Sequence, residues 1–326
     1  MNKPLKLLFV TCLFIGVSSV ALAAGGLELT EPVLARINEF CIKHKFRTWN
    51  LDLTSARDFK HEGTAFEGTE IWFHKRGEFL FKYSYKTKKL TSCFHSKFYT
   101  EITMLDHKTF REFDDPPEQK WTSESAVGYG HGFARACLGE MPENLGPAKF
   151  EFYRQRGTYN KETNKVRYRI PYWQVEYPRI DKNGYEFQAE YISIKLFEEM
   201  GPYSLHVKMY SSYKQVEGEP LKQEKVMKAA LAYAGEMMKR GAVVGLFRGG
   251  KINEAPASAK LEIVKPNRLA DLSDLPASKD IDLNARLAWV IWFEWTNLNP
   301  KDARQKGGLA VWIDAHTGKP LGGDAF

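Results

Sequence analysis

The feature that most constrains the fold of this chain is a pattern that recurs three times, at intervals of roughly 90 to 100 residues. Each copy combines an amphipathic helix with aromatic-rich strands and a glycine-containing turn. The helices are predicted over Glu31–Lys45, Thr122–Met141 and Leu221–Arg240. A shift of about 100 residues places apolar residues of the second helix on similar residues of the third, including Ala126 on Val226, Phe133 on Tyr233 and Ala134 on Ala234. Each copy needs the same kind of partner surface for its apolar stripe, so the recurrence predicts tandem modules.

Two breaks divide the chain into these modules. The paired prolines of Asp114-Asp115-Pro116-Pro117 stop both helices and strand ladders, and Gly218-Glu219-Pro220 precedes the third helix. We therefore predict an N-terminal α+β module at 24–117, a second α+β module at 118–217 and a C-terminal module at 218–326. In each module one helix packs on an antiparallel β-sheet, so the predicted fold class is α+β.

The first 23 residues have the pattern of a secretory signal peptide. Lys3 and Lys6 form a basic start, Leu7–Val20 is apolar, and Ala21-Leu22-Ala23 is a small-residue cleavage site. We expect the protein to be exported, secreted or periplasmic, with residues 1–23 removed; a signal retained as a membrane anchor is the alternative. No later stretch approaches the ~18 apolar residues that a span requires, so we expect no integral membrane span after cleavage.

The charge of the chain is mildly basic, with 47 Lys and Arg against 40 Asp and Glu. The basic residues are dispersed, which is typical of a solvated surface. Export argues against nucleic acid as a partner. An anionic polymer of the cell envelope remains an alternative partner for such a surface.

A family resemblance is carried by the closing segment Leu309–Gly322, which contains Val311-Trp312-Ile313-Asp314-Ala315-His316-Thr317-Gly318. It resembles the last strand and turn of PepSY-type domains, which end in valine-x-isoleucine/valine-aspartate-alanine-x-threonine-glycine. The strand Ala285–Ile291 and the alanine-rich helix Gln223–Met238 resemble the preceding strand and the opening helix of that family. The resemblance covers the C-terminal module best and extends more weakly to tandem copies upstream.

The resemblance implies a PepSY-like or cystatin-like α+β unit that binds protein. PepSY-like domains occur in propeptides of thermolysin-type proteases and in exported multi-module proteins, and are proposed to restrain peptidases. The family carries no recognised catalytic residue in the closing turn. The resemblance therefore implies no catalytic residue and no cofactor for this chain.

The closing turn also has a physical explanation of its own. Asp314 can accept hydrogen bonds from the backbone N–H groups that follow it, and Thr317 can cap the turn locally. Gly318 supplies a positive φ. We therefore predict that Asp314, Thr317 and Gly318 have structural roles.

Three cysteines follow the signal: Cys41, Cys93 and Cys137. An odd number in an oxidising compartment allows at most one internal disulfide. Cys41 lies on the first helix and Cys93 on a strand of the same predicted module, so this pair is the preferred disulfide. Cys137 lies on the apolar face of the second helix and is interpreted as a buried thiol.

A zinc site is the alternative for the first two cysteines. Cys41 and His44 lie three residues apart on one helix face, and Cys93 and His95 lie two apart on one strand face. If that helix packs on that strand, the four side chains form a set of zinc ligands.

The C-terminal module carries four tryptophans that the predicted hairpin brings together: Trp289, Trp292, Trp295 and Trp312. Most aromatic residues in such strands form the core. Trp292 and Trp295 are the candidates for an exposed face that binds a peptide or glycan. An exposed strand edge would bind a peptide by adding it as a further strand.

The sequence thus predicts an exported, non-catalytic protein that binds another protein and restrains or assists an envelope or secreted peptidase. One alternative is a binding module for an anionic polymer or glycan at the envelope surface. Another is an enzyme of an unrecognised type. The sequence does not define the oligomeric state.

Overall fold

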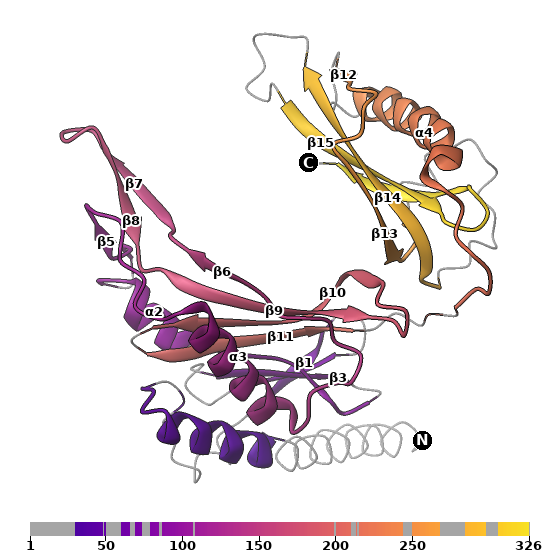
Figure 1. Cartoon of the computed structure of the whole chain (residues 1–326). Coiled ribbons are helices and arrows are strands. Elements are labelled where there is room, and N and C mark those ends of the chain that lie inside the picture. The colour runs from indigo at the N-terminus through magenta and orange to yellow at the C-terminus, as the bar shows by residue number, and fades with distance from the viewer. Residues whose placement is uncertain are drawn as a thin grey trace, which may run out of the picture. The chain divides into compact units, whose positions relative to one another are not determined.

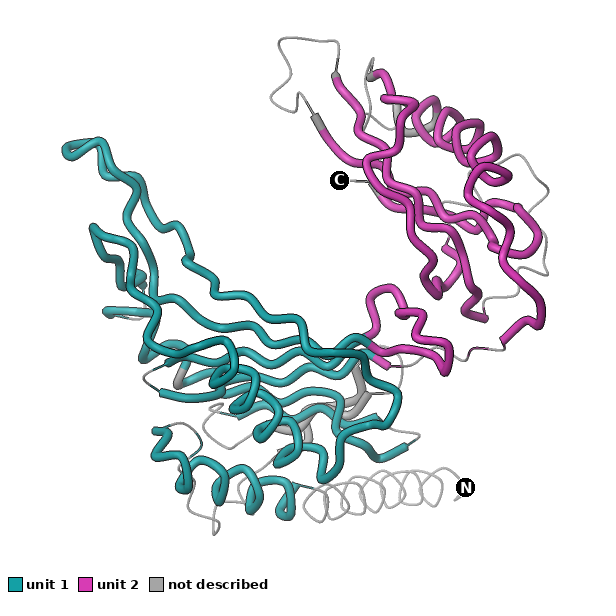
Figure 2. Tube along the Cα trace, viewed as in Figure 1, with its two compact units in different colours: residues 1–178, 191–208 teal, residues 179–190, 209–326 magenta. Residues whose placement is uncertain are grey.

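The computed structural model describes residues 30–47, 49, 60–65, 69–73, 79–84, 87–106, 108–198, 200–209, 213, 215–243, 250–267, 284–297 and 306–325. The predicted signal peptide lies outside these residues. The chain forms two compact units, which are coloured separately in Figure 2. Unit 1 comprises residues 1–178 and 191–208, and unit 2 comprises residues 179–190 and 209–326. In both units helices pack on mainly antiparallel sheets, which confirms the predicted α+β class.

The sheet of unit 1 is built from eight consecutive neighbours among the described strands. Their order is β1 (Lys60–Ala65), β2 (Thr69–Phe73), β3 (Phe79–Ser84), β4 (Leu90–His95), β11 (Gly201–Lys208), β10 (Glu186–Phe197), β9 (Tyr172–Ile180) and β6 (Lys149–Tyr153). The boundary between the units falls within β9 and β10. Segments that are about 110 residues apart in the sequence lie side by side in this sheet, because β11 pairs antiparallel with β4.

Two helices cover one face of this sheet (Figure 1). The N-terminal helix is described over residues 30–43, and α3 spans Ser123–Leu138. Thr122 is the N-cap of α3, where its side chain accepts a hydrogen bond from the Ser125 N–H. The guanidinium of Arg36 donates to the backbone carbonyls of Ala136 and Cys137, so the N-terminal helix also holds the last turn of α3.

The apolar stripes of these helices pack closely on the sheet. Gly130 of α3 is buried, and a Cβ there would lie 3.1 Å from Cβ of Val175 in β9. Trp49 and Phe133 lie in the same layer, with ring centroids 5.9 Å apart. The fully buried members of this core with the largest side chains include Trp49, Tyr83, Phe81, Phe133, Leu34, Ile37, Ile192, Ile194, Leu196 and Leu205. A single core therefore joins the first two predicted modules.

A short helix and a small sheet complete unit 1. Helix α2 spans Ser96–Thr103, where the sequence pattern predicts extended segments at Leu90–Phe98 and Thr100–Leu105. The small sheet has the order β5 (Glu112–Phe113), β8 (Lys165–Arg169) and β7 (Arg156–Asn160). Its strands pair antiparallel.

Unit 2 packs one long helix on one face of an antiparallel sheet. Helix α4 spans Gln223–Val243, and the sheet runs β13 (Ser258–Val264), β14 (Arg286–Asn297), β15 (Lys306–Asp314) and β16 (Pro320–Ala325). The short strand β12 (Gly250–Ile252) also pairs with β14, and Phe187 at the start of β10 pairs in parallel with Ile263. The face toward α4 contains Ile291, Phe293, Trp295, Leu309, Val311 and Ile313. Ala288 and Val290 are fully buried on the opposite face, so both faces of β14 contribute to packing.

The predicted helices are confirmed within a few residues of their expected ends. The helices α3 and α4 also bury equivalent positions, since Ala126, Phe133 and Ala134 correspond to the buried Val226, Tyr233 and Ala234. The grouping of the modules differs from the expectation. Most of the predicted modules 24–117 and 118–217 contributes to one sheet and one core in unit 1. The whole of the predicted third module, 218–326, lies in unit 2, together with residues 179–190 and 209–217 of the second. The first two predicted modules share one sheet because β11, from the second module, pairs with β4, from the first.

Candidate functional site

The side chains of the predicted zinc set are used for packing. The imidazole of His44 packs on Phe40 and Tyr129, with ring centroids 4.7 and 5.4 Å apart. The imidazole of His95 is buried against Phe79, with the centroids 4.2 Å apart. Over the part of the chain that the structure describes, no three His, Cys, Asp or Glu side chains are grouped to hold a metal ion. The structure therefore does not assemble a zinc site from Cys41, His44, Cys93 and His95.

The three described cysteines, Cys41, Cys93 and Cys137, are buried. The Sγ of Cys93 lies 3.6 Å from the Sγ of Cys137, whereas the preferred pairing from the sequence is Cys41 with Cys93. The difference arises because α3 carries Cys137 onto β4, the strand that holds Cys93. Burial, the hydrogen bond with Cys93 and the proximity of Cys41 together raise the pKa of the Cys137 thiol well above its usual value. A raised pKa makes the thiol a poor nucleophile at neutral pH.

The closing turn of unit 2 is held by the carboxylate of Asp314. Its Oδ1 accepts hydrogen bonds from the N–H groups of His316 and Thr317, at 3.0 and 2.8 Å. Gly318 has a φ of +72° and donates to the Asp314 carbonyl at 2.9 Å. The Thr317 hydroxyl accepts from the Lys319 N–H at 3.4 Å. These bonds explain the sequence motif by turn geometry alone.

The two tryptophans considered for a binding face lie on opposite faces of β14. Trp295 is only 3 % exposed and lies in the core beneath α4. Trp292 is partly exposed and packs near Val290 and Trp312 on the other face. The two rings therefore do not form a common exposed surface.

Unit 1 contains a groove with a volume of about 1010 Å³. It lies where the segment after the N-terminal helix, α2, β5 and the end of β10 meet. Its lining residues are Arg47, Glu101, Ile102, Arg111, Glu112, Phe113, Asp114, Asp115, Pro116, Pro117, Glu118, Lys120, Arg167, Ile170, Pro171, Phe197, Glu198 and Met200. The sequence carries one signal at this place, the Asp-Asp-Pro-Pro break, which predicts only a module boundary.

The floor of the groove belongs to a hydrophobic cluster. Ile102 of α2 and Phe197 of β10 are nearly fully buried, and they pack with Tyr203 of β11. The rings of Phe197 and Tyr203 are stacked with centroids 4.7 Å apart. Burial raises the pKa of Tyr203 far above its usual value, so its hydroxyl stays neutral. The floor of the groove is therefore apolar.

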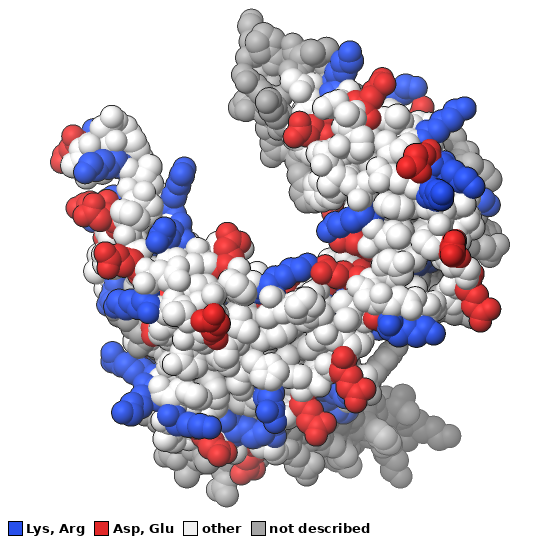
Figure 3. Space-filling model, viewed as in Figure 1, with Lys and Arg blue, Asp and Glu red and all other residues white. Residues whose placement is uncertain are grey.

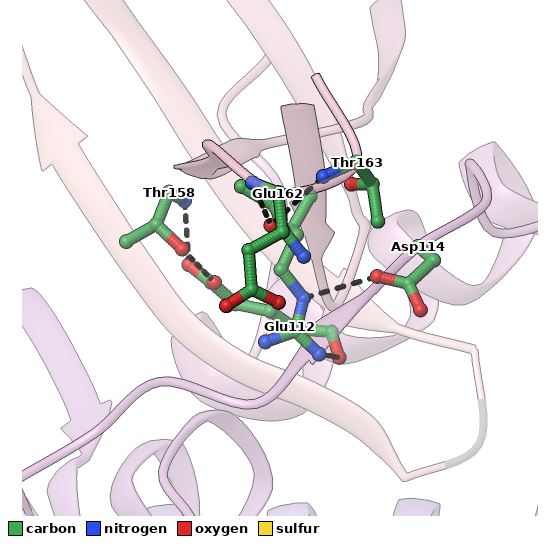
Figure 4. Close-up of polar contacts among 7 residues, drawn as sticks. Glu112, Asp114, Thr158, Glu162 and Thr163 are labelled. Carbon is green, nitrogen blue, oxygen red and sulfur yellow. Dashed lines mark hydrogen bonds and ion pairs between the residues drawn. The ribbon is translucent and has the colours of Figure 1, made fainter. Parts of the chain in front are cut away.

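One wall of the groove is fixed by Glu112, as Figure 4 shows. Its carboxylate accepts hydrogen bonds from the N–H and the hydroxyl of Thr158 in β7. Arg167 donates to the Glu112 carbonyl at 3.2 Å and lies 3.3 Å from Asp114. Burial alone would raise the pKa of Glu112, but the Thr158 bonds and the charges of Arg167 and Arg169 outweigh it and lower that pKa. Glu112 is therefore an ionised structural group.

The opposite rim is fixed by Glu198. Its Oε1 accepts from the Trp121 N–H at 2.9 Å and from Nε1 of Trp173 at 2.8 Å, while Oε2 accepts from the Lys120 N–H at 2.9 Å. In the sequence, Glu198 falls in a pair of adjacent carboxylates at a turn, which is typical of a solvated position. The donors lie far from Glu198 along the chain, so no local pattern indicates the bonds. Glu198 holds the segment before α3 against the end of β10.

The remaining charges of the rim are mixed in sign. Arg47 and Arg111 are exposed, as are Asp115 and Glu118. Phe113 adds an aromatic ring that is 45 % exposed. The described lining residues include no histidine, cysteine, serine, threonine or tyrosine. An apolar floor with a charged rim is suited to holding an extended polypeptide segment.

A second charged feature lies on the face of the sheet opposite α3. His206 of β11 is aligned across the strands with Ser92 and Ser193, and Ser92 Oγ lies 2.9 Å from its Nδ1. Partial burial and then the charges of Lys195, Lys82 and Lys208 lower the pKa of His206 below 6.5. On the face of the molecule that Figure 3 draws, acidic and basic side chains are interspersed.

No family model matches the chain, and no curated protein matches it. Among solved structures, the chain is similar to an uncharacterized protein from Eubacterium rectale ATCC 33656, at 14% identity and a TM-score of 0.48, over 88% of this chain and 80% of that chain. It is also similar to the C-terminal domain of YpeB from Bacillus megaterium, at 10% identity and a TM-score of 0.34, over 82% of this chain and 88% of that chain. We therefore argue function from the residues of this chain.

None of the helices in the described residues has the length and apolar character needed to cross a membrane.

The role of Glu198 predicts a stability effect. Glu198→Ala removes the acceptor of three N–H donors, of which those of Trp121 and Trp173 are partly buried, and a donor left unsatisfied away from water costs about 1–3 kcal/mol. We expect the free energy of unfolding, measured by urea titration, to fall by about 2 kcal/mol. The matched control is Glu118→Ala on the same rim, which is exposed and should change it by less than about 0.5 kcal/mol. Equal effects of the two variants would contradict the role given to Glu198.

Proposed function

We propose that this protein binds another protein without catalysing a reaction, and that the groove of unit 1 holds an extended segment of that partner. The observation that carries the proposal is the combination of an apolar floor with an exposed rim that carries both positive and negative charges. Ile102 and Phe197 form the floor, and Phe113 and Arg111 project at the rim. Such a surface desolvates an apolar side chain and orients its charged neighbours.

The composition of the groove supports binding over turnover. A hydroxyl or thiol nucleophile acts beside a general base such as histidine, and the described lining residues include no Ser, Thr, Cys or His. Of the carboxylates there, Glu112 and Glu198 are engaged in structural hydrogen bonds. The groove would thus hold a bound segment without cleaving it.

The second part of the proposal concerns the identity of the partner protein. The C-terminal segment resembles PepSY-type domains, and that family occurs with peptidases. We propose that the partner is an envelope or secreted peptidase, and that the exported chain restrains or assists it. A groove that accepts a segment in extended form would suit contact with a loop of that enzyme.

Panning a displayed library of short unstructured peptides on the purified protein tests the groove. We expect enriched peptides to bind the wild-type protein, and Phe113→Ser to weaken their binding at least about tenfold, because the exposed aromatic ring at the rim is lost as a contact. Binding is measured by calorimetry with synthetic peptides.

Tyr159→Ser is the matched control for this test. Tyr159 lies on β7, is 54 % exposed and does not line the groove, so its loss should leave peptide binding unchanged. The proposal fails if no peptide is enriched, or if both variants bind the peptides as tightly as the wild type.

A second candidate function is the binding of an anionic polymer or glycan. The observation that favours it is the cluster of Lys82, Lys195 and Lys208 around His206 on one sheet face. Lys195 lies over the ring of Tyr172, 5.1 Å from its centroid, and Lys208 lies at the same distance over Tyr191. Cations beside aromatic rings form a surface suited to an anionic sugar or phosphate polymer.

The pKa of His206, followed by NMR, tests this candidate. Added polyphosphate supplies negative charge, which favours the imidazolium and should raise that pKa, and salt should reverse the change. Lys82→Gln should raise it without any ligand because a positive charge is removed, whereas Lys165→Gln on β8 is the control and should not. A pKa that does not respond to polyphosphate at low salt would exclude this role for the cluster.

A further inference from the structure

The strand β6 is one of the two outer strands of the unit 1 sheet, and one of its edges is open in the described part of the chain. Within the described residues β6 pairs only with β9, and Figure 1 shows it at the margin of the sheet. Lys149, Phe150 and Glu151 are exposed there, and half of Phe150 (50 %) is accessible. An edge strand with an exposed aromatic ring is a template for pairing with a further strand.

The side chains of β6 alternate between the two faces of the sheet. Phe150 and Phe152 lie on the face of Val175 and Trp173, their register partners in β9. Lys149, Glu151 and Tyr153 lie on the other face, where the Tyr153 hydroxyl is hydrogen-bonded to Glu151. One face of the edge is thus aromatic, and the other carries a positive and a negative charge two residues apart.

This pattern is complementary to itself. If two copies of β6 pair antiparallel with Phe150 opposite Phe150, Lys149 of each copy lies opposite Glu151 of the other. Opposite charges and aromatic pairs at directly opposed positions stabilise an antiparallel pair. A two-fold axis through the pair of Phe150 residues gives both strands the same contacts, as a closed dimer requires.

We propose that β6 is an interaction surface for a second copy of this chain, with the two edges paired antiparallel about Phe150. The charge pattern favours this occupant, because antiparallel pairing of two copies about Phe150 places each Lys149 opposite a Glu151 of the other copy. Pairing covers the exposed ring of Phe150 and fills the open backbone edge. The surface is separate from the groove, since Lys149, Phe150 and Glu151 do not line it.

Analytical ultracentrifugation of charge variants tests the proposal. In Glu151→Lys, positions 149 and 151 both carry a positive charge. Position 151 lies opposite the neutral Gln174 in β9, so the substitution places no like charges opposite each other within the sheet. Lys149→Glu is combined with Glu176→Lys, because Lys149 lies opposite Glu176 in β9. Each variant alone should dimerise at least about tenfold more weakly than the wild type.

The decisive sample is an equal mixture of these two variants. At positions 149 and 151, one variant then presents two positive charges and the other presents two negative charges. A heterodimer should therefore form with about the wild-type affinity. Phe150→Ser should weaken the wild-type dimer, whereas Phe113→Ser in the groove should not. Circular dichroism verifies that each variant is folded.

Three results would each overturn the proposal. These are a wild-type protein that stays monomeric at the highest concentration reached, an association that Glu151→Lys does not weaken, and a mixture that associates no better than the separate variants. None of these results depends on the peptide-binding groove, so the two proposals are tested independently.

Discussion

The N-terminal helix and α3 bury their apolar stripes on the same face of one sheet, and the rest of unit 1 depends on that packing. Tyr83 of β3 donates to Thr30 at the start of the first helix, at 3.2 Å, and Arg36 caps the end of α3. Because neither helix has a sheet of its own, the two predicted modules cannot be separated without exposing both stripes to water. The shared core is thus the reason that unit 1 extends over both modules.

The same arrangement shapes the groove. The turn between β10 and β11 must approach the end of the N-terminal helix closely, and Gly201 makes this possible with a φ of +102°. A Cβ at that position would lie 2.6 Å from Cγ of Phe46. The turn then places Phe197 in the groove floor and Glu198 beneath the segment that starts α3. The groove therefore forms where elements from distant parts of the sequence are fixed against each other.

Local patterns in the sequence are sufficient for the long helices, the strand β14 and the Asp314 turn, since each depends on residues close together in the chain. The helix α2 is not predicted, because its aromatic and β-branched residues also fit a strand. An apolar stripe shows that a helix is covered but does not identify the covering sheet, so the joining of two modules and the approach of Cys93 to Cys137 are not evident from the sequence. The groove is missed for the same reason, because the hydrogen bonds of Glu198 and Glu112 join residues remote in sequence.

The structure of unit 1 depends on the position of α3 on β4, and the native thiols report that position directly. The reduced, unfolded protein is refolded in a glutathione redox buffer, and the linked peptides are identified by mass spectrometry. Because the Sγ atoms of Cys93 and Cys137 lie 3.6 Å apart, we expect a Cys93–Cys137 disulfide, with Cys41 left as a thiol. A dominant Cys41–Cys93 disulfide, or a Cys93 and Cys137 that never link, would contradict it.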